Sequence, residues 1–218
     1  MKKSFIGVVS ILLNPSEYLR FGNHVILSRL FIEKGNKKDI SHTEIKKSTI
    51  RVHGLKNVVQ ISGAEVYNTR IDIRGKNNAL IVESGVKLYN MHLQIHSNNN
   101  LIHIGRWTTF GGGNIISETD ANSIKIGEDC MIADFVDIWN SDTHKIYSEN
   151  GAISNTGRPI IIGNHVWVGK DVAILKGVSI GDGAVIGMKS VVTNDVAPSS
   201  LYAGIPARKI KTGIRWER

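Results

Sequence analysis

Aliphatic residues return at every sixth position through the C-terminal part of the chain. From position 162 onward they are Ile162, Val168, Ile174, Ile180, Ile186 and Val192. A small or β-branched residue follows each of them four positions later. A helix has a period of about 3.6 residues and an ordinary strand a period of about 2, so neither gives this spacing. The pattern predicts a repeat in which two positions of every six point inward.

A six-residue unit supplies one short strand and one corner, so three units close a triangular coil. Residues 162–179 and 180–197 form two such coils. The same code predicts two more coils upstream, through Ile104, Phe110 and Ile116 and through Ile126, Ile132 and Ile138. Successive coils would stack by parallel main-chain hydrogen bonds. The predicted fold class is therefore all-β, a parallel β-helix of hexapeptide repeats.

Looser coils are expected before residue 100. Three segments recur there at intervals of 21 and 22 residues, each followed by an aliphatic-rich strand: Gly54 to Asn57, Gly75 to Asn78 and Ser97 to Asn100. Gly and Asn tolerate a positive φ, which suits a corner. We expect the β-helix to occupy residues 46–200, between a basic N-terminal extension (1–45) and a basic C-terminal tail (201–218).

The repeat is interrupted between Ile138 and Ile162, although the six-residue count is kept. Positions 144, 150 and 156 of this frame hold His, Asn and Thr. Polar residues at inward sites do not build an apolar core, so we expect an excursion loop at about residues 140–157. Loops on a rigid scaffold are common places for functional residues. A regular β-helix without chemistry, an assembly module, is the alternative, because fold alone assigns no activity.

Composition and charge narrow the setting. The chain has 218 residues, 41% of them hydrophobic, and one cysteine, Cys130, which excludes an intramolecular disulfide framework and favours the cytoplasm. The apolar run from Phe5 to Leu13 is short and lacks a small-residue cleavage site, so we do not expect export. The net charge of +8 is concentrated at the two ends. Basic ends suit phosphates, an anionic polymer or a membrane surface, whereas no basic-aromatic stripe indicates nucleic acid.

Three motifs carry a resemblance to a known family. They are Asp142-Thr-His144, the run from Gly157-Arg-Pro159 through Asn164-His-Val-Trp167 to Gly169, and Gly204-Ile-Pro206-Ala-Arg208. With these motifs the chain resembles the hexapeptide-repeat acetyltransferases, and most of all the bacterial capsule and polysialic acid O-acetyltransferases, over roughly residues 100–211. The resemblance implies a left-handed helix, acetyl-CoA as cosubstrate, and a homotrimer with active sites between subunits.

His144 is the candidate catalytic residue. Acetyl transfer from a thioester to an alcohol requires removal of the hydroxyl proton, and the pKa of a histidine, about 6.5, suits that task. We expect a backbone carbonyl or the Asp142 carboxylate to hold its other nitrogen, with Tyr147 nearby as a supporting residue. Trp167 matches a tryptophan that lies beside this histidine in the similar enzymes, although corner packing is the alternative role. Cys130 falls at an inward position and is not expected to be a nucleophile.

Cofactor residues follow from the resemblance to galactoside-type acetyltransferases. It implies that Gly169, Lys170, Met188 and Thr193 follow the pantetheine arm together with Trp167, and that Arg208 and Lys211 face the phosphates. Three histidines, His92, His96 and His103, invite comparison with carbonic anhydrases that share the architecture, but no ligating carboxylate accompanies them and we expect no metal. His165 is expected at the surface or at an interface.

The resemblance thus implies an O-acetyltransferase that moves acetyl from acetyl-CoA to a sugar hydroxyl, with a surface polysaccharide as the leading acceptor and a sialic acid-containing one among the candidates. The positive N-terminal third suits a polyanionic acceptor. A small acceptor, such as a free sugar, an amino sugar or an antibiotic, is the first alternative. The non-catalytic module and a metal-dependent lyase follow. Peripheral membrane contact through the N-terminal segment is a further expectation.

Overall fold

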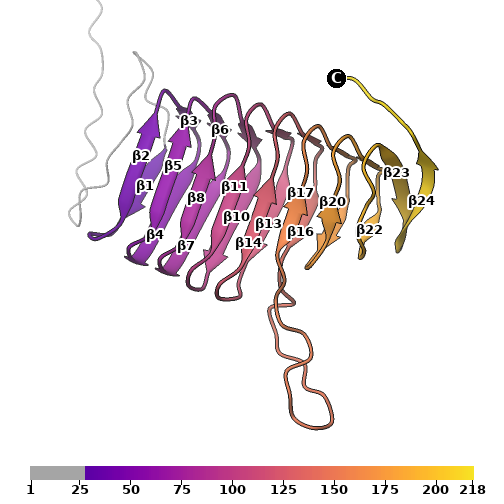
Figure 1. Cartoon of the computed structure of the whole chain (residues 1–218). Helices are drawn as coiled ribbons and strands as arrows, with labels where there is room; N and C mark the ends of the chain where they lie inside the picture. Colours follow the sequence, from indigo (N-terminus) through magenta and orange to yellow (C-terminus); the bar gives the residue numbers. More distant parts are fainter. Residues whose placement is uncertain (1–27) are drawn as a thin grey trace, which may run out of the picture.

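The computed structural model describes residues 28–218. They form a β-helix whose three faces are β-sheets, and they contain no α-helix (Figure 1). Residues 1–27, which include the Phe5 to Leu13 run and part of the expected basic extension, lie outside the described residues. Within residues 28–218, no helix is long and apolar enough to cross a membrane. The coils wind left-handed, as the family resemblance implied, and successive coils pair in parallel register.

Each face of the β-helix is one sheet, and we number the three sheets in the order in which the chain enters them. Sheet 1 contains β1 (Arg29–Ile32), β4 (Thr49–Leu55), β7 (Arg70–Lys76), β10 (Met91–His96), β13 (Gly113–Ser117), β16 (Val136–Trp139), β19 (Ala173–Leu175) and β22 (Val191–Val192). Sheet 2 contains β2 (Lys37–Ser41), β5 (Val58–Ser62), β8 (Ala79–Val82), β11 (Leu101–Ile104), β14 (Ser123–Ile126), β17 (Ile160–Ile162) and β20 (Ser179–Ile180).

Sheet 3 is the face that closes each coil. It contains β3 (Glu44–Lys46), β6 (Glu65–Tyr67), β9 (Lys87–Tyr89), β12 (Thr109–Phe110), β15 (Met131–Ile132), β18 (Trp167–Val168), β21 (Val185–Ile186), β23 (Ser200–Gly204) and β24 (Ala207–Thr212). The last pair, β23 and β24, is antiparallel. This hairpin ends the stack at the C-terminal side.

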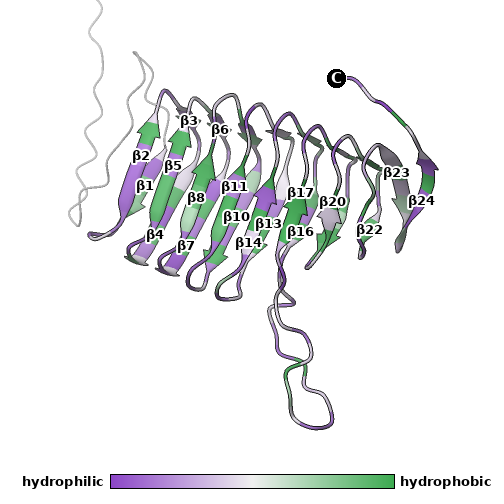
Figure 2. Cartoon of the chain, viewed as in Figure 1, coloured by the Kyte–Doolittle hydropathy of each residue, from purple (hydrophilic) through white to green (hydrophobic). Residues whose placement is uncertain are grey.

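The core is a set of aliphatic stacks inside the three sheets. All six repeat positions from Ile162 to Val192 are buried, which confirms the predicted period. In sheet 1, one stack runs through the register partners Ile50, Ile71, Leu93, Ile115, Ile138, Ile174 and Val192. Polar and apolar positions alternate along the strands (Figure 2). Each buried aliphatic side chain contributes roughly 1.5–3 kcal/mol.

The predicted inward position Ile116 was wrong by one residue. Ile115, not Ile116, pairs with inward Leu93 and Ile138. Ile116 pairs with Gln94 and Trp139 on the outer face of sheet 1, yet it is only 4% exposed. The inward positions Phe110 and Ile115 are only five residues apart, and their register partners in the preceding coil, Leu88 and Leu93, have the same spacing. The strict count of six therefore loses register there.

The corner between sheets 1 and 2 is built from asparagines, as the Gly/Asn recurrences predicted. The side-chain oxygens of Asn36, Asn57, Asn78 and Asn100 each accept the backbone N–H of the asparagine one coil later. Asn78 also donates to the carbonyls of Arg74 and Ser97, at 3.2 and 2.7 Å. The ladder satisfies polar backbone groups that the corner removes from water.

Glycine is required beside this ladder. Gly54 and Gly75 pair in register and have φ values of 99° and 108°. A Cβ on either one would collide with a backbone carbonyl of the next coil. Only glycine combines this dihedral with so close an approach.

The coils extend further at both ends than the sequence division suggested. Residues 29–46 supply β1, β2 and β3, which pair in parallel with the second coil. Residues 200–212 supply β23 and β24. The final residues then cross the corner between sheets 2 and 3, where Trp216 is buried. The N-terminal extension, β-helix and C-terminal tail remain a proposed division of the chain.

Candidate active site

The predicted excursion loop leaves the stack between β16 and β17. Its two ends are held together because the Arg158 N–H donates to the Asn140 carbonyl at 3.0 Å. Further out, Tyr147 and Ile153 form an antiparallel bridge, so the segment is an irregular hairpin that projects from the molecule (Figure 1). We call residues 140–158 the arm. Ile146, Tyr147 and Ile153 on the arm are 57%, 59% and 42% exposed.

A cleft of about 240 Å³ lies at the base of the arm. His144 lines it, as does Asp142, whereas Tyr147 lies further out on the arm. The other lining residues come from the arm and from the segment after β13: Glu118, Thr119, Asp120, Ser141, Thr143, Lys145, Ile153, Asn155, Thr156 and Gly157.

His144 is positioned through its backbone. Its N–H donates to the Asp142 carbonyl at 2.6 Å, and its carbonyl accepts the Asn155 side-chain amide at 2.8 Å. The Asn155 side-chain oxygen also accepts the Ile146 N–H at 2.6 Å. Asn155 therefore ties the two strands of the arm together around His144. Sequence reasoning missed Asn155, because nothing in a six-residue repeat links positions 144 and 155.

The Asp142 carboxylate contacts groups other than the His144 ring in the single chain. It accepts hydrogen bonds from the Lys176 ammonium and, at 2.8 Å, from the Asn155 amide. Hydrogen bonding to Lys176 and to Asn155 outweighs partial burial and holds the pKa of Asp142 below its ordinary value. Lys176 follows β19, so this ion pair fastens the arm to the next coil. The carboxylate thus orients the histidine indirectly, through Asn155 and the backbone.

Trp167 lies on another face of the β-helix. It belongs to β18 of sheet 3, with its side chain on the outer surface and the residue 39% exposed. The His144 cleft is lined by no residue of sheet 3. A single chain therefore does not bring His144 and Trp167 together.

The C-terminal residues meet Trp167, an arrangement that the sequence did not reveal. The Trp216 ring stacks on His165 with centroids 4.0 Å apart and lies 6.1 Å from the ring of Trp167. Trp216 Nε1 donates to the His165 carbonyl at 3.0 Å, and His165 Nδ1 lies 2.7 Å from Asp129. His165, expected at a surface or interface, is half-buried beneath the Trp216 ring. The contacts join residues 51 positions apart, which no local pattern can predict.

The predicted cofactor residues fall into three places. Gly169, Lys170 and Met188 gather at the corner between sheets 3 and 1, where a Cβ on Gly169 would meet the Met188 backbone nitrogen at 2.7 Å. Thr193 follows β22 and is exposed beside sheet 1. Arg208 and Lys211 are exposed on β24, at the edge of sheet 3. β24 is three strand steps from Trp167, about 14 Å.

Two of the three histidines considered as metal ligands, and Cys130, have structural contacts. His96 Nε2 lies 3.3 Å from Asp72 on sheet 1, and His103 Nε2 lies 2.8 Å from Glu83 on sheet 2. Within residues 28–218, no three His, Cys, Asp or Glu side chains are grouped to hold a metal ion. Cys130 is buried, its Sγ lies 3.1 Å from the Gly163 carbonyl, and burial raises the pKa of its thiol to about 11. It is a packed thiol, not a thiolate nucleophile.

Known proteins match this fold and sequence. Residues 159–194 match the family model described as bacterial transferase hexapeptide (six repeats). A polysialic acid O-acetyltransferase of Neisseria meningitidis is 36% identical over 146 residues, which cover 65% of this chain and 67% of that protein. A polysialic acid O-acetyltransferase of Escherichia coli O1:K1 / APEC is 41% identical over 116 residues, 53% of this chain and 38% of that protein. The crystal structure of the polySia-specific acetyltransferase NeuO superposes with a TM-score of 0.83 at 33% identity, covering 88% of this chain and 89% of that one.

The left-handed β-helix, its hexapeptide code and these matches define the class. The chain belongs to the hexapeptide-repeat acetyltransferases. Within that family it is an O-acetyltransferase similar to the polysialic acid enzymes, and this similarity extends over most of its length.

Proposed function

We propose that the chain transfers acetyl from acetyl-CoA to a hydroxyl group of a surface polysaccharide, with a sialic acid-containing polymer as the leading acceptor. The position of His144 carries the proposal: its backbone is fixed on both sides while its side chain lines an open cleft. The relatives named above are polysialic acid enzymes, which supports this acceptor. A reaction that uses acetyl-CoA suits the cytoplasm.

The proposed reaction is a direct transfer. His144 takes the proton of the acceptor hydroxyl as its oxygen attacks the thioester carbonyl, and a C–O bond forms. The C–S bond then breaks, and the histidinium returns the proton to the leaving thiolate of coenzyme A. The products are the acetyl ester and the free thiol. No acyl-enzyme is needed, in keeping with the burial of Cys130.

A homotrimer would complete the site. His144 and Trp167 lie on different faces of one chain, so a neighbouring subunit is needed to place the Trp167 indole beside the histidine. The arm carries three exposed apolar side chains, Ile146, Tyr147 and Ile153, which suit burial against a second copy. Trp167 would then form one wall of the thioester channel, with Tyr147 nearby in support.

Acetyl-CoA would run along the corner beside Trp167. The pantetheine amides would pair there with coil backbone groups at Gly169, and Lys170 and Met188 would flank the chain. Thr193 would lie at one side of this path. Arg208 and Lys211 on β24 would meet the phosphates, since both are exposed cations at the edge of the same sheet.

One observation favours a small neutral acceptor as a second candidate. The cleft is lined by three carboxylates, Glu118, Asp120 and Asp142, against one lysine, Lys145. A polyanion would be repelled there unless its charges contact other parts of the surface. A neutral free sugar would not be repelled.

The test is the variant His144→Ala in the full chain. We expect kcat to fall by about 10²- to 10⁴-fold. The fold and the acetyl-CoA KM should be unchanged because the arm lies outside the stacked coils. The oligomeric state should be unchanged because His144 is not one of the three apolar arm residues that would contact the neighbouring subunit. His103→Ala, a histidine on sheet 2 away from the cleft, is the matched control and should keep its kcat. Retention of more than about a tenth of wild-type kcat by His144→Ala would remove the general-base assignment.

A further inference from the structure

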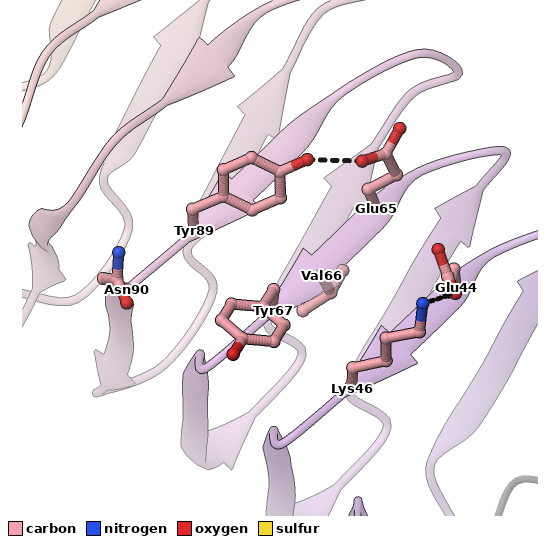
Figure 3. Close-up of a pocket in the computed structure, with 7 residues that line it drawn as sticks. All are labelled: Glu44, Lys46, Glu65, Val66, Tyr67, Tyr89 and Asn90. Carbon is pink, nitrogen blue, oxygen red and sulfur yellow. Dashed lines mark hydrogen bonds and ion pairs between the residues drawn. The ribbon is translucent and has the colours of Figure 1, made fainter. Parts of the chain in front are cut away.

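A second cavity, of about 450 Å³, opens on sheet 3 near the N-terminal end of the β-helix. Two tyrosines, Tyr67 on β6 and Tyr89 on β9, line it with their rings nearly perpendicular and 6.4 Å apart. Figure 3 shows both rings together with the other lining residues: Glu44, Lys46, Glu65, Val66 and Asn90. None of these residues has a part in the proposed transfer reaction.

Hydrogen bonds fix the polar groups of this cavity. The Tyr89 hydroxyl donates to the Glu65 carboxylate, which also pairs with Lys87 at 3.1 Å. Glu65 raises the pKa of Tyr89 to about 12, so this hydroxyl remains a donor at neutral pH. Lys47 donates to the Tyr67 hydroxyl at 2.9 Å and lies 5.2 Å from its ring centroid. The cavity thus combines aromatic faces with oriented hydroxyl, carboxylate and ammonium groups.

These groups suit a saccharide better than an apolar ligand. A sugar ring presents C–H groups that pack on an aromatic face and hydroxyls that need oriented donors and acceptors. The cation balance also suits an anionic sugar. Three lysines (Lys46, Lys47 and Lys87) surround the tyrosines, against two carboxylates, Glu44 and Glu65. Glu44 pairs with Lys46 and Glu65 pairs with Lys87, so one positive charge is in excess.

The cavity is aligned with Trp167. Outer residues of consecutive sheet 3 strands pair in one row, which runs from Trp167 through Met131, Thr109 and Lys87 to Glu65. Lys87 is three strand steps from Trp167, about 14 Å, and Glu65 is four steps away, about 19 Å. Arg218, which also pairs with Asp129, hydrogen-bonds Thr109 midway along the row, at 3.2 Å. An extended anionic chain could follow this row from the transfer site to the tyrosines.

We propose that the Tyr67–Tyr89 cavity is a distal subsite that binds a saccharide unit of a long, anionic acceptor while another unit is acetylated beside Trp167. This proposal rests on the proposed function for its acceptor. It explains how a polyanion is held even though the His144 cleft is acidic: the binding contacts lie on sheet 3, away from those carboxylates.

The experiment compares two acceptors with the full-length enzyme. Long-chain polysialic acid can span the row, whereas a sialic acid disaccharide cannot. For the double variant Tyr67→Ala/Tyr89→Ala we expect the KM for the polymer to rise about tenfold, with unchanged kcat, unchanged acetyl-CoA KM and unchanged kcat/KM for the disaccharide. Phe31→Ala on sheet 1 is the matched control, since Phe31 and Tyr67 are 37% and 38% exposed, and it should leave every constant unchanged.

Three results would overturn the subsite. They are an unchanged polymer KM, an equal loss with both acceptors, and conversion of the double variant to monomers in ultracentrifugation, which would identify this face as a subunit interface.

Fluorescence polarisation of labelled polysialic acid separates this proposal from the proposed function. If the wild type acetylates neither acceptor but binds the polymer about tenfold more tightly than the double variant, the acceptor assignment fails and the subsite stands. Equal binding by both proteins sinks the subsite.

Discussion

Asp72 is a carboxylate on the outer face of sheet 1 that nevertheless has no exposed surface. It accepts hydrogen bonds from Arg70 and Arg74, both at 3.1 Å, and lies 3.3 Å from His96. Burial by itself raises the pKa of Asp72, but the hydrogen bonds from Arg74, Arg70 and His96 outweigh it and hold the pKa well below its usual range. The charged form is therefore stabilised by folding.

This arrangement predicts a pH-dependent loss of stability in Asp72→Asn. A carboxyl group with a lowered folded-state pKa stabilises the fold above its unfolded pKa of about 3.9, and the contribution is lost as the pH falls below that value toward the folded pKa. We expect Asp72→Asn to lower the free energy of unfolding by about 1–3 kcal/mol at pH 7 and by progressively less below pH 4. Urea unfolding at several pH values measures this. Asp39→Asn, at an exposed carboxylate on sheet 2, should change stability by less than about 0.5 kcal/mol at pH 7.

At the scale of one element, the hexapeptide code predicted the strands well where each coil has eighteen residues. It located every inward residue from Ile162 to Val192 and the Gly/Asn corners before residue 100. It misplaced Ile116, because the inward positions Phe110 and Ile115 are five residues apart and a period of six does not hold there. Asn155 and Lys176, which hold Asp142 and the arm, were also missed. Their contacts span 11 to 34 positions and depend on how the arm folds back on the stack.

The asparagine ladder gives a prediction for one corner. Asn78→Ala would leave the Asn100 N–H and the Ser97 carbonyl without their present partner in a buried corner. Each orphaned group costs about 1–3 kcal/mol, so we expect a loss of about 2–4 kcal/mol in the free energy of unfolding. Chemical denaturation monitored by circular dichroism measures it. Gln60→Ala, on the exposed side of β5, should stay within about 0.5 kcal/mol of the wild type. A comparable stability of Asn78→Ala and Gln60→Ala would show that the ladder contributes little.

The arm gives a prediction about assembly. If its exposed apolar side chains pack on a neighbouring subunit, Ile146→Ser/Tyr147→Ser should raise the trimer dissociation constant by about tenfold or more. Activity should then fall on dilution, because a monomer keeps His144 and Trp167 on separate faces. Sedimentation velocity and activity over the same concentration series measure both effects. Ile210→Ser, at an exposed position on β24, is the control. A variant that remains a trimer at every concentration would show that the arm is not part of the interface.

At the scale of the whole molecule, the basic segments at the two ends of the sequence do not lie at two opposite ends of the proposed site. The C-terminal residues fold back over the corner of sheet 3, so Trp216 and Arg218 reach His165, Asp129 and Thr109. The basic residues before position 60 are divided among the faces. Lys46 is the last residue of β3 in sheet 3, the sheet of Trp167, and Lys47 follows it at the corner, whereas Lys37 and Lys38 belong to sheet 2. The charge of each segment could be predicted from the sequence. The sheet on which each basic residue lies could not, because it depends on the register of the first coil.

This division separates two lysine pairs that the sequence treats alike. If a polyanionic acceptor follows sheet 3, Lys46→Gln/Lys47→Gln should raise the acceptor KM several-fold with kcat and the acetyl-CoA KM nearly unchanged, the signature of lost uniform binding. Lys37→Gln/Lys38→Gln removes the same charge from sheet 2 and should have a clearly smaller effect.

The wild-type acceptor KM should also rise steeply between low salt and about 0.15 M, where the screening length is about 8 Å. Steady-state kinetics with polysialic acid measure all three. Equal effects of the two pairs would indicate attraction by net charge alone, and a KM that ignores salt and both pairs would favour the small neutral acceptor.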